Sequence, residues 1–165
     1  MSSKNLIKGM GFILRRANPS DVAPHLNYLQ DKETKRNFMS VPKTLSEARK
    51  ELFNKKNDTF VIQVDGEFAG TIGMHDIIPN HKAILSYWLA RKFRGQGIMT
   101  RATKLFTRYA FKKYKLRRIY GFVRTFNKAS CIVLERAGYQ LEGRLRKNKL
   151  RNGKYMDDFV YAKVR

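Results

Sequence analysis

Apolar residues recur along the chain with two different spacings, and each change of spacing marks a new predicted element. Apolar residues three or four apart predict helices, whereas alternating or β-branched runs predict strands. The order obtained is one strand, two helices, three strands, a helix, a strand, a helix and two strands. The predicted strands cover residues 12–17, 59–64, 68–78, 83–89, 118–123, 139–149 and 154–164, and the predicted helices cover residues 20–31, 45–53, 97–114 and 127–137.

Turn and capping residues lie at the boundaries of these elements. Thr44 and Glu47 form the spacing of a capping box before the second helix. Asp65-Gly66 and Asn152-Gly153 are typical of tight hairpin turns, and Gly138 is typical of a helix C-terminus. We therefore expect a single domain over residues 1–165, with residues 1–10 as a flexible arm and an α/β (α+β) fold in which helices cover both faces of a mixed sheet.

The composition is that of a folded domain, since 42% of the residues are hydrophobic and 12% are aromatic. Cys131 is the single cysteine, which excludes an intramolecular disulfide and predicts a small buried residue. No apolar run approaches the roughly 20 residues of a membrane span, and the first residues lack the apolar core of a secretory signal. We expect a cytoplasmic protein with no membrane contact and no bound metal.

The charge is unusual, because 35 Lys and Arg residues oppose 13 Asp and Glu residues and give a net charge of +22. Such a field favours anionic partners, either nucleic acid, the ribosome or a polyphosphate cofactor, and disfavours polyamine substrates. Basic residues gather at 112–118 and at 144–151. Plain solubility explains the charge equally well, so proximity to RNA or the ribosome is one of two interpretations.

The stretch SYWLARKFRGQGIMTRATKLF, residues 86–106, predicts a strand that passes through a glycine-containing turn into a helix. Free N–H groups and the positive end of the helix dipole make such a helix start an anion site. Gly95 and Gly97 allow a close approach of the backbone, and Arg94 adds a charged donor. An ordinary connection between a strand and a helix is the alternative. The spacing is neither that of a P-loop nor that of a dinucleotide fingerprint.

This turn resembles the coenzyme A motif of the GNAT acetyltransferase superfamily, in which Arg or Gln is followed after two residues by Gly-x-Gly or Gly-x-Ala. Arg94 and Gly97 match the motif, whereas Met99 departs from its last position. The segment NKASCIVLERAGYQLEGRLRKNKL, residues 127–150, resembles the Rim-type branch, which acetylates the N-termini of ribosomal proteins. The resemblance extends over roughly residues 11 to 163 and implies a mostly antiparallel, twisted sheet of about seven strands with helices on both faces.

The resemblance also implies where acetyl-coenzyme A lies. Its pantetheine arm is expected along the strand that ends at Trp88, Leu89 and Ala90. Its phosphates are expected over the turn and helix start, at Arg94, Gly95, Gln96, Gly97, Ile98, Met99 and Thr100. Asn127 is either a helix cap or a coenzyme contact, and both roles are compatible.

The resemblance implies that Ser130 contacts the coenzyme and acts as the acid for the departing thiolate, although a plain helix-surface serine is the alternative. The general base is where the match fails, because the usual Glu position holds Ile84. Asp76, His75 and Tyr87 remain candidates, each with a structural alternative, as does a water molecule without a dedicated base. A free N-terminal amine has a pKa near 8, so a weak base suffices.

Three functions are consistent with these features. The first is transfer of acetyl from acetyl-coenzyme A to a primary amine by direct attack in a ternary complex, most simply a protein N-terminal α-amine of ribosomal-protein type. The second is acetylation of a small-molecule amine. The third is an inactive RNA-binding or ribosome-binding protein on the same fold. The sequence allows a monomer or a homodimer.

Overall fold

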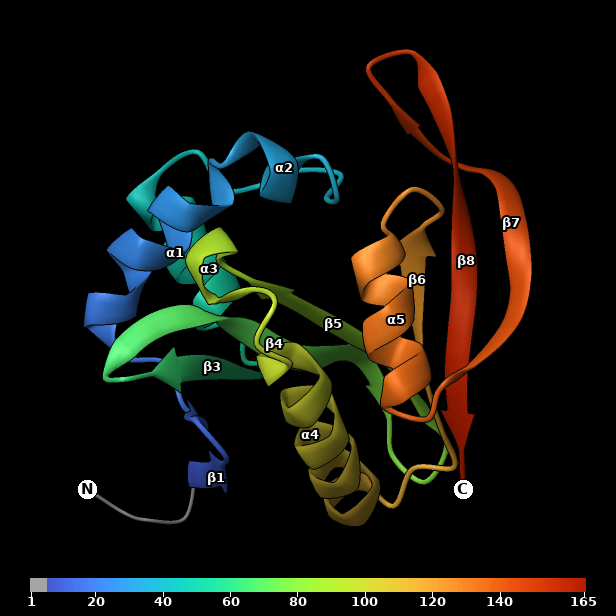
Figure 1. The fold of residues 1–165 in the computed structure, drawn as a ribbon, viewed down its shortest axis with the longest axis horizontal. Helices are drawn as coiled ribbons and strands as arrows, with labels where there is room; N and C mark the ends of the chain where they lie inside the picture. The colour runs from blue at the N-terminus through green and yellow to red at the C-terminus, as the bar shows by residue number, and fades with distance from the viewer. Residues whose placement is uncertain (1–5) are drawn as a thin grey trace.

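The computed structural model describes residues 6–165, and an open sheet of eight strands forms their framework (Figure 1). The strands lie in the order β1-β2-β3-β4-β5-β6-β8-β7, and all neighbouring pairs are antiparallel except β5 and β6. The elements are β1 (Leu6–Gly9), β2 (Phe12–Arg15), α1 (Val22–Leu29), α2 (Lys32–Lys35), α3 (Leu45–Leu52), β3 (Asp58–Val64), β4 (Glu67–Ile78), β5 (Lys82–Leu89), α4 (Ile98–Tyr114), β6 (Arg118–Arg124), α5 (Lys128–Arg136), β7 (Gln140–Arg151) and β8 (Lys154–Val164).

The parallel pair β5–β6 is short and then opens. Its register covers three pairs, from Lys82–Arg118 to Ile84–Tyr120, after which the two strands diverge (Figure 1). Gly121 lies where they part, and a Cβ there would be 3.1 Å from the Leu85 carbonyl oxygen. Beyond this point the edge of β5 that faces β6 carries no strand pairing within the described residues. The opening between β5 and β6 is called the split below.

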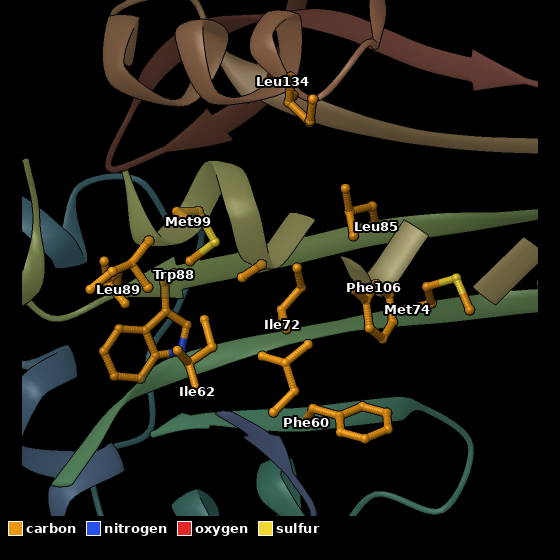
Figure 2. Close-up of a cluster of buried hydrophobic side chains, with 14 of the residues drawn as sticks. Phe60, Ile62, Ile72, Met74, Leu85, Trp88, Leu89, Met99, Phe106 and Leu134 are labelled. Carbon is orange, nitrogen blue, oxygen red and sulfur yellow. The ribbon is translucent and has the colours of Figure 1, made fainter. Parts of the chain in front are cut away.

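Helices cover both faces of the sheet. Neighbouring residues of β5 show this, because successive side chains on a strand point to opposite faces. Trp88 on β5 packs against the ring of His25 from α1, at 5.5 Å between ring centroids. Its neighbour Tyr87 contacts Ser130 of α5 on the other face. The core fills the space between the sheet and the helices, and Figure 2 shows Phe60, Ile62, Ile72, Met74, Leu85, Trp88, Leu89, Met99, Phe106 and Leu134 within it.

A buried carboxylate ties α4 to the start of β3. The Oδ2 atom of Asp58, at the start of β3, accepts hydrogen bonds from Tyr109 at 2.9 Å, Tyr114 at 2.8 Å and Lys113 at 3.1 Å. Its Oδ1 lies 2.6 Å from Arg16. Burial alone raises the pKa of Asp58, but these donors outweigh it and hold the pKa below the ordinary value.

Most of the predicted elements are confirmed, with three differences. Residues 6–9 form β1, which pairs with β2, so the flexible arm predicted over residues 1–10 is wrong there; residues 1–5 lie outside the described residues. This pairing brings the sheet to eight strands, against about seven expected. The helix predicted over residues 20–31 is divided, because Asp31 caps a separate helix by accepting from the Thr34 N–H. None of the described helices is long and apolar enough to cross a membrane.

Candidate functional site

The turn between β5 and α4 forms a cradle of free backbone donors. Gly95 and Gly97 have φ angles of 77° and 69°, in the left-handed region that favours glycine, and Gly97 is the N-cap of α4. Within residues 6–165, no backbone N–H from Gly95 to Thr100 donates to another protein group. The helix dipole adds a positive potential at the same place. The turn is therefore suited to a phosphate or another anion.

Arg94 is occupied by protein contacts that fix the cradle. Its Nε donates to the Leu89 carbonyl at 2.9 Å, and its Nη2 donates to Thr34 Oγ1 at 2.6 Å. Glu33 lies 3.4 Å from its Nη1. The guanidinium predicted as a direct anion donor therefore joins the end of β5 to α2, and most of the donors offered to an anion are backbone N–H groups.

Met99, the departure from the motif, is buried, and its side chain belongs to the hydrophobic core (Figure 2). Ile98 is buried in the same way, whereas Gln96 is exposed. A methionine side chain at this position therefore leaves the backbone N–H groups of the helix start unobstructed. Met99 therefore affects the packing of the core and leaves the backbone N–H donors of the turn in place.

The strand-end residues predicted to bind the cofactor offer fewer free backbone groups than expected. The Leu89 carbonyl accepts from Arg94, and the Ala90 N–H donates to the Ala69 carbonyl at 2.8 Å. Trp88 turns its indole toward α1, away from Tyr87. The unpaired backbone groups on the edge of β5 that faces the split therefore lie mainly before Leu89 along the strand.

Tyr87 and Ser130 meet across the split. The Tyr87 hydroxyl lies 2.8 Å from Ser130 Oγ and also donates to the Ser130 carbonyl at 3.3 Å. Burial raises the pKa of the Tyr87 phenol, although the hydrogen bond from Ser130 opposes the shift. The phenol is therefore protonated at neutral pH and serves as a donor. The two predicted residues form one hydrogen-bonded pair that joins β5 to α5.

Asn127 places Ser130 by capping α5. Its side-chain oxygen accepts from the Ser130 N–H at 3.1 Å, which satisfies one free donor at the start of the helix. The capping role expected for Asn127 is confirmed, and the expected coenzyme contact stays a prediction. Ser130 is half-buried and faces the split, so it is not a plain surface serine.

The two acid–base candidates on β4 lie apart from this pair. His75 is the register partner of Ile84, whereas Ile72 is the partner of Tyr87. Three residues separate these positions, or roughly 10 Å along the strand. The Asp76 side chain is 75% exposed and lies 3.1 Å from His75. The structure therefore does not bring Asp76 or His75 together with Tyr87 and Ser130.

Sequence reasoning missed a contact between buried His25 and half-exposed Glu51 on the opposite face of β5. His25 Nε2 lies 3.0 Å from Glu51 Oε2, and His25 Nδ1 is buried without a partner among the described residues. Both residues line a cavity of about 320 Å³ that reaches Ser86 and Tyr87. The available signal was a histidine on the apolar stripe of α1, which Val22 and Leu29 define.

A second feature missed from the sequence is a groove of about 750 Å³ at the open end of the split. Half of its lining residues are cationic and none is acidic. Its lining residues are Gln30, Lys32, Lys35, Arg36, Phe126, Arg151, Asn152, Lys154, Tyr155 and Met156. This surface is called the basic groove below. Within residues 6–165, no cluster of three or more His, Cys, Asp or Glu side chains could hold a metal ion.

A mixed sheet whose parallel pair splits beside a glycine turn at a helix start is the architecture of acyl-coenzyme A-dependent transferases. The family model described as "Acetyltransferase (GNAT) domain" matches residues 12–140, which is most of the chain. The chain therefore belongs to the GNAT acetyltransferase family, as the resemblance of its motifs implied.

Known relatives carry more than one acceptor in their names. The chain is 35% identical over 99 residues to YdaF of Bacillus subtilis (strain 168), whose name describes a ribosomal N-acetyltransferase, and the match covers 59% of this chain and 54% of YdaF. It is 29% identical over 107 residues to spermidine N(1)-acetyltransferase of Escherichia coli (strain K12), covering 64% of this chain and 58% of that protein. The chain thus spans little more than half the length of these relatives.

A solved structure of RimL, a ribosomal L7/L12 alpha-N-protein acetyltransferase, in complex with coenzyme A is similar over almost the full length. The TM-score is 0.85 at 27% sequence identity, and the match covers 97% of this chain and 98% of that one. A protein that shares this fold over almost its full length therefore binds coenzyme A.

Proposed function

We propose that this protein is an N-acetyltransferase that transfers an acetyl group from acetyl-coenzyme A to a protein N-terminal α-amine, by direct attack in a ternary complex. One observation carries the proposal: the split, the cradle at residues 95–100 and the Tyr87–Ser130 pair lie together. A backbone edge, an anion site and a proton donor are what acyl transfer from a long phosphorylated thioester requires.

The residues present fit acetyl-coenzyme A, which supplies an activated acetyl thioester when it is bound. The free N–H groups from Gly95 to Thr100 would hold its phosphates, and the unpaired edge of β5 would hold its amide-bearing arm. Gly121 lets β6 stay close to β5 up to Leu85, because a Cβ there would lie 3.1 Å from the Leu85 carbonyl oxygen, and the unpaired edge of β5 begins after this contact.

Ser130 Oγ supplies a proton at the split in this mechanism. The Tyr87 hydroxyl orients it and can restore the proton, because burial keeps the phenol protonated. Asn127 holds the backbone of the same helix turn in place. Ser130 is thus the proposed acid and Tyr87 its positioning partner.

A dedicated base is not required for an α-amine, since its pKa of about 7.7–8.0 leaves a useful neutral fraction at physiological pH. The separation of Asp76 from the Tyr87–Ser130 pair argues against a role for this carboxylate as the base. We propose instead that a water molecule takes the proton from the amine.

A peptide acceptor fits the charges better than a polyamine. The net charge of +22 and a groove without acidic residues disfavour a polycation. The likeness to RimL supports an N-terminal acceptor, and the same positive field supports a location close to the ribosome.

The test is to mix the purified protein with acetyl-coenzyme A and peptides that carry ribosomal-protein N-termini, and to follow thiol release and peptide mass. Ser130→Ala should lower kcat by about 100-fold, within the range of general acid catalysis, while calorimetry shows unchanged affinity for acetyl-coenzyme A. Ser46→Ala, on the exposed face of α3, is the matched control and should leave both unchanged. If no peptide is acetylated, or if Ser130→Ala retains full kcat, the proposal fails.

A further inference from the structure

The basic groove is made from three segments that are far apart in sequence. Lys32, Lys35 and Arg36 come from α2 and the residue after it, Phe126 precedes α5, and residues 151–156 form the tip of the β7–β8 hairpin. Five of its ten lining residues are cationic, whereas 35 of 165 are cationic in the whole chain. The concentration of positive charge therefore exceeds what the composition alone would place there.

The walls of the groove are held in a fixed arrangement. Arg151 Nη1 donates to the carbonyls of Lys35 at 3.2 Å, Arg36 at 3.2 Å and Phe38 at 2.8 Å, which joins the hairpin to the segment after α2. The Arg36 guanidinium lies 5.2 Å from the centroid of the Phe126 ring. A groove that is already formed loses little conformational entropy when a ligand enters.

None of the five groove cations forms an ion pair with a carboxylate of residues 6–165, and two of the groove lysines lack hydrogen bonds as well. The side chains of Lys32 and Lys154 are exposed and make no hydrogen bond or ion pair with residues 6–165. The one acidic residue of α2, Glu33, is paired with Arg94, at 3.4 Å from its Nη1. Unpaired cations that converge on a concave surface raise the local positive potential and attract an anion.

The groove lies beside the proposed acetyl-transfer site. Phe126 directly precedes Asn127, which caps the helix that carries Ser130. On the other wall, Gln30 Nε2 donates to the Pro42 carbonyl at 2.8 Å, and Pro42 lines the cavity that reaches Tyr87. A chain whose terminal amine lies at the Tyr87–Ser130 pair can therefore continue into the groove.

We propose that the basic groove binds an acidic segment of the acceptor polypeptide, a few residues after the amine that receives the acetyl group. This inference rests on the proposed function and names its substrate class. A peptide is favoured over single-stranded RNA because Phe126 of the groove directly precedes the cap of the helix that carries Ser130, so the chain behind an acetylated N-terminus passes this groove of about 750 Å³, which Tyr155 and Met156 also line. Acidic side chains pair with the lysines while the peptide backbone crosses this lining.

The experiment compares peptides that share the same first three residues and differ in the next five, which are acidic, neutral or basic. We expect kcat/KM to fall from acidic to neutral to basic peptide by about tenfold per step, mainly through KM, and the differences to shrink at high salt because the charges are exposed. The KM for acetyl-coenzyme A should be the same throughout.

Lys32→Ala/Lys154→Ala should lower kcat/KM for the acidic peptide by about fivefold, since each exposed pair contributes modestly, and should leave the neutral peptide unchanged. Lys50→Ala/Lys112→Ala removes the same charge from exposed positions on α3 and α4 and is the control. Neither of the two substituted groove lysines makes a polar side-chain contact, so the fold should be retained, as a thermal melt will show.

Four results would overturn the inference. Equal kcat/KM for all peptides would remove the acidic preference while leaving the proposed function intact. A raised KM for acetyl-coenzyme A in Lys32→Ala/Lys154→Ala would assign the groove to the cofactor. A single-stranded oligoribonucleotide that binds more tightly than the acidic peptide, and loses affinity in the same variant, would assign it to RNA. If no peptide is acetylated, anisotropy of a labelled acidic peptide still tests the groove, and equal binding by both double variants would refute it.

Discussion

The ion pair between Arg124 and Asp158 is buried at the open end of the split. The two residues are register partners on β6 and β8, and they are 8% and 0% exposed. Asp158 also accepts from the Asn148 side chain at 2.7 Å, while Arg124 Nε has no partner among the described residues. A substitution at Asp158 would therefore leave a buried guanidinium without its counter-charge.

We predict that Asp158→Ala lowers the free energy of unfolding by about 4 kcal/mol, within the 3–5 kcal/mol typical when one partner of a buried pair is removed. The unfolding entropy of 165 residues is about 350 cal/mol/K at roughly 2.1 cal/mol/K per residue. The expected loss in Tm is then about 11 °C. Scanning calorimetry measures the Tm, and urea titration measures the free energy of unfolding independently.

The double variant Arg124→Leu/Asp158→Leu should recover a large part of this loss, because it removes both charges instead of stranding one. Glu142→Ala breaks the exposed pair with Arg118 and should shift the Tm by no more than about 3 °C. An Asp158→Ala variant that melts within 3 °C of the wild type would show that Arg124 finds water or another partner, and the reasoning would be refuted.

Three further predictions concern the cradle, the proton donor and the free energy of unfolding at low pH. Gly97→Ala forces a side chain into a φ of 69° and should weaken acetyl-coenzyme A binding by about tenfold in calorimetry, whereas Gly66→Ala, at φ 82° in a remote hairpin, should not. Tyr87→Phe keeps the ring but loses the hydrogen bond to Ser130, so kcat should fall by about tenfold while KM for acetyl-coenzyme A holds; an unchanged kcat would exclude the positioning role. Because the pKa of Asp58 is lowered in the folded state, its stabilisation is present above the unfolded pKa of about 3.9 and is lost as pH falls through the folded pKa. Asp58→Asn should therefore cost about 2 kcal/mol at pH 7, and urea titrations should show the gap closing below pH 4; a pH-independent gap would contradict this.

Local features of the site could be predicted from the sequence, whereas features made by distant segments could not. The turn with Gly95 and Gly97 and the cap at Asn127 follow from neighbouring residues, because turn and cap chemistry act over a few positions. The contact of Arg94 with Thr34 depends on where α2 packs, which no local pattern encodes.

The same reason explains why the His25–Glu51 pair and the basic groove were missed. His25 and Glu51 are 26 positions apart in the chain, and the groove combines residues from near 35 and near 155. Burial and proximity of this kind arise only when the helices pack on the sheet. Strand β1 was missed for another reason: its short run of residues gains stability from pairing with β2 more than from its own pattern.

The short parallel contact between β5 and β6 has a consequence for the order in which the molecule opens. Strands β1 to β5 pair with sequence neighbours, as do β7 and β8, whereas three parallel register pairs join the two parts of the sheet. Native-state hydrogen exchange should therefore resolve two cooperative units that meet at this seam. Because a ligand in the split would touch both units, its binding should merge their exchange rates and raise the protection of each.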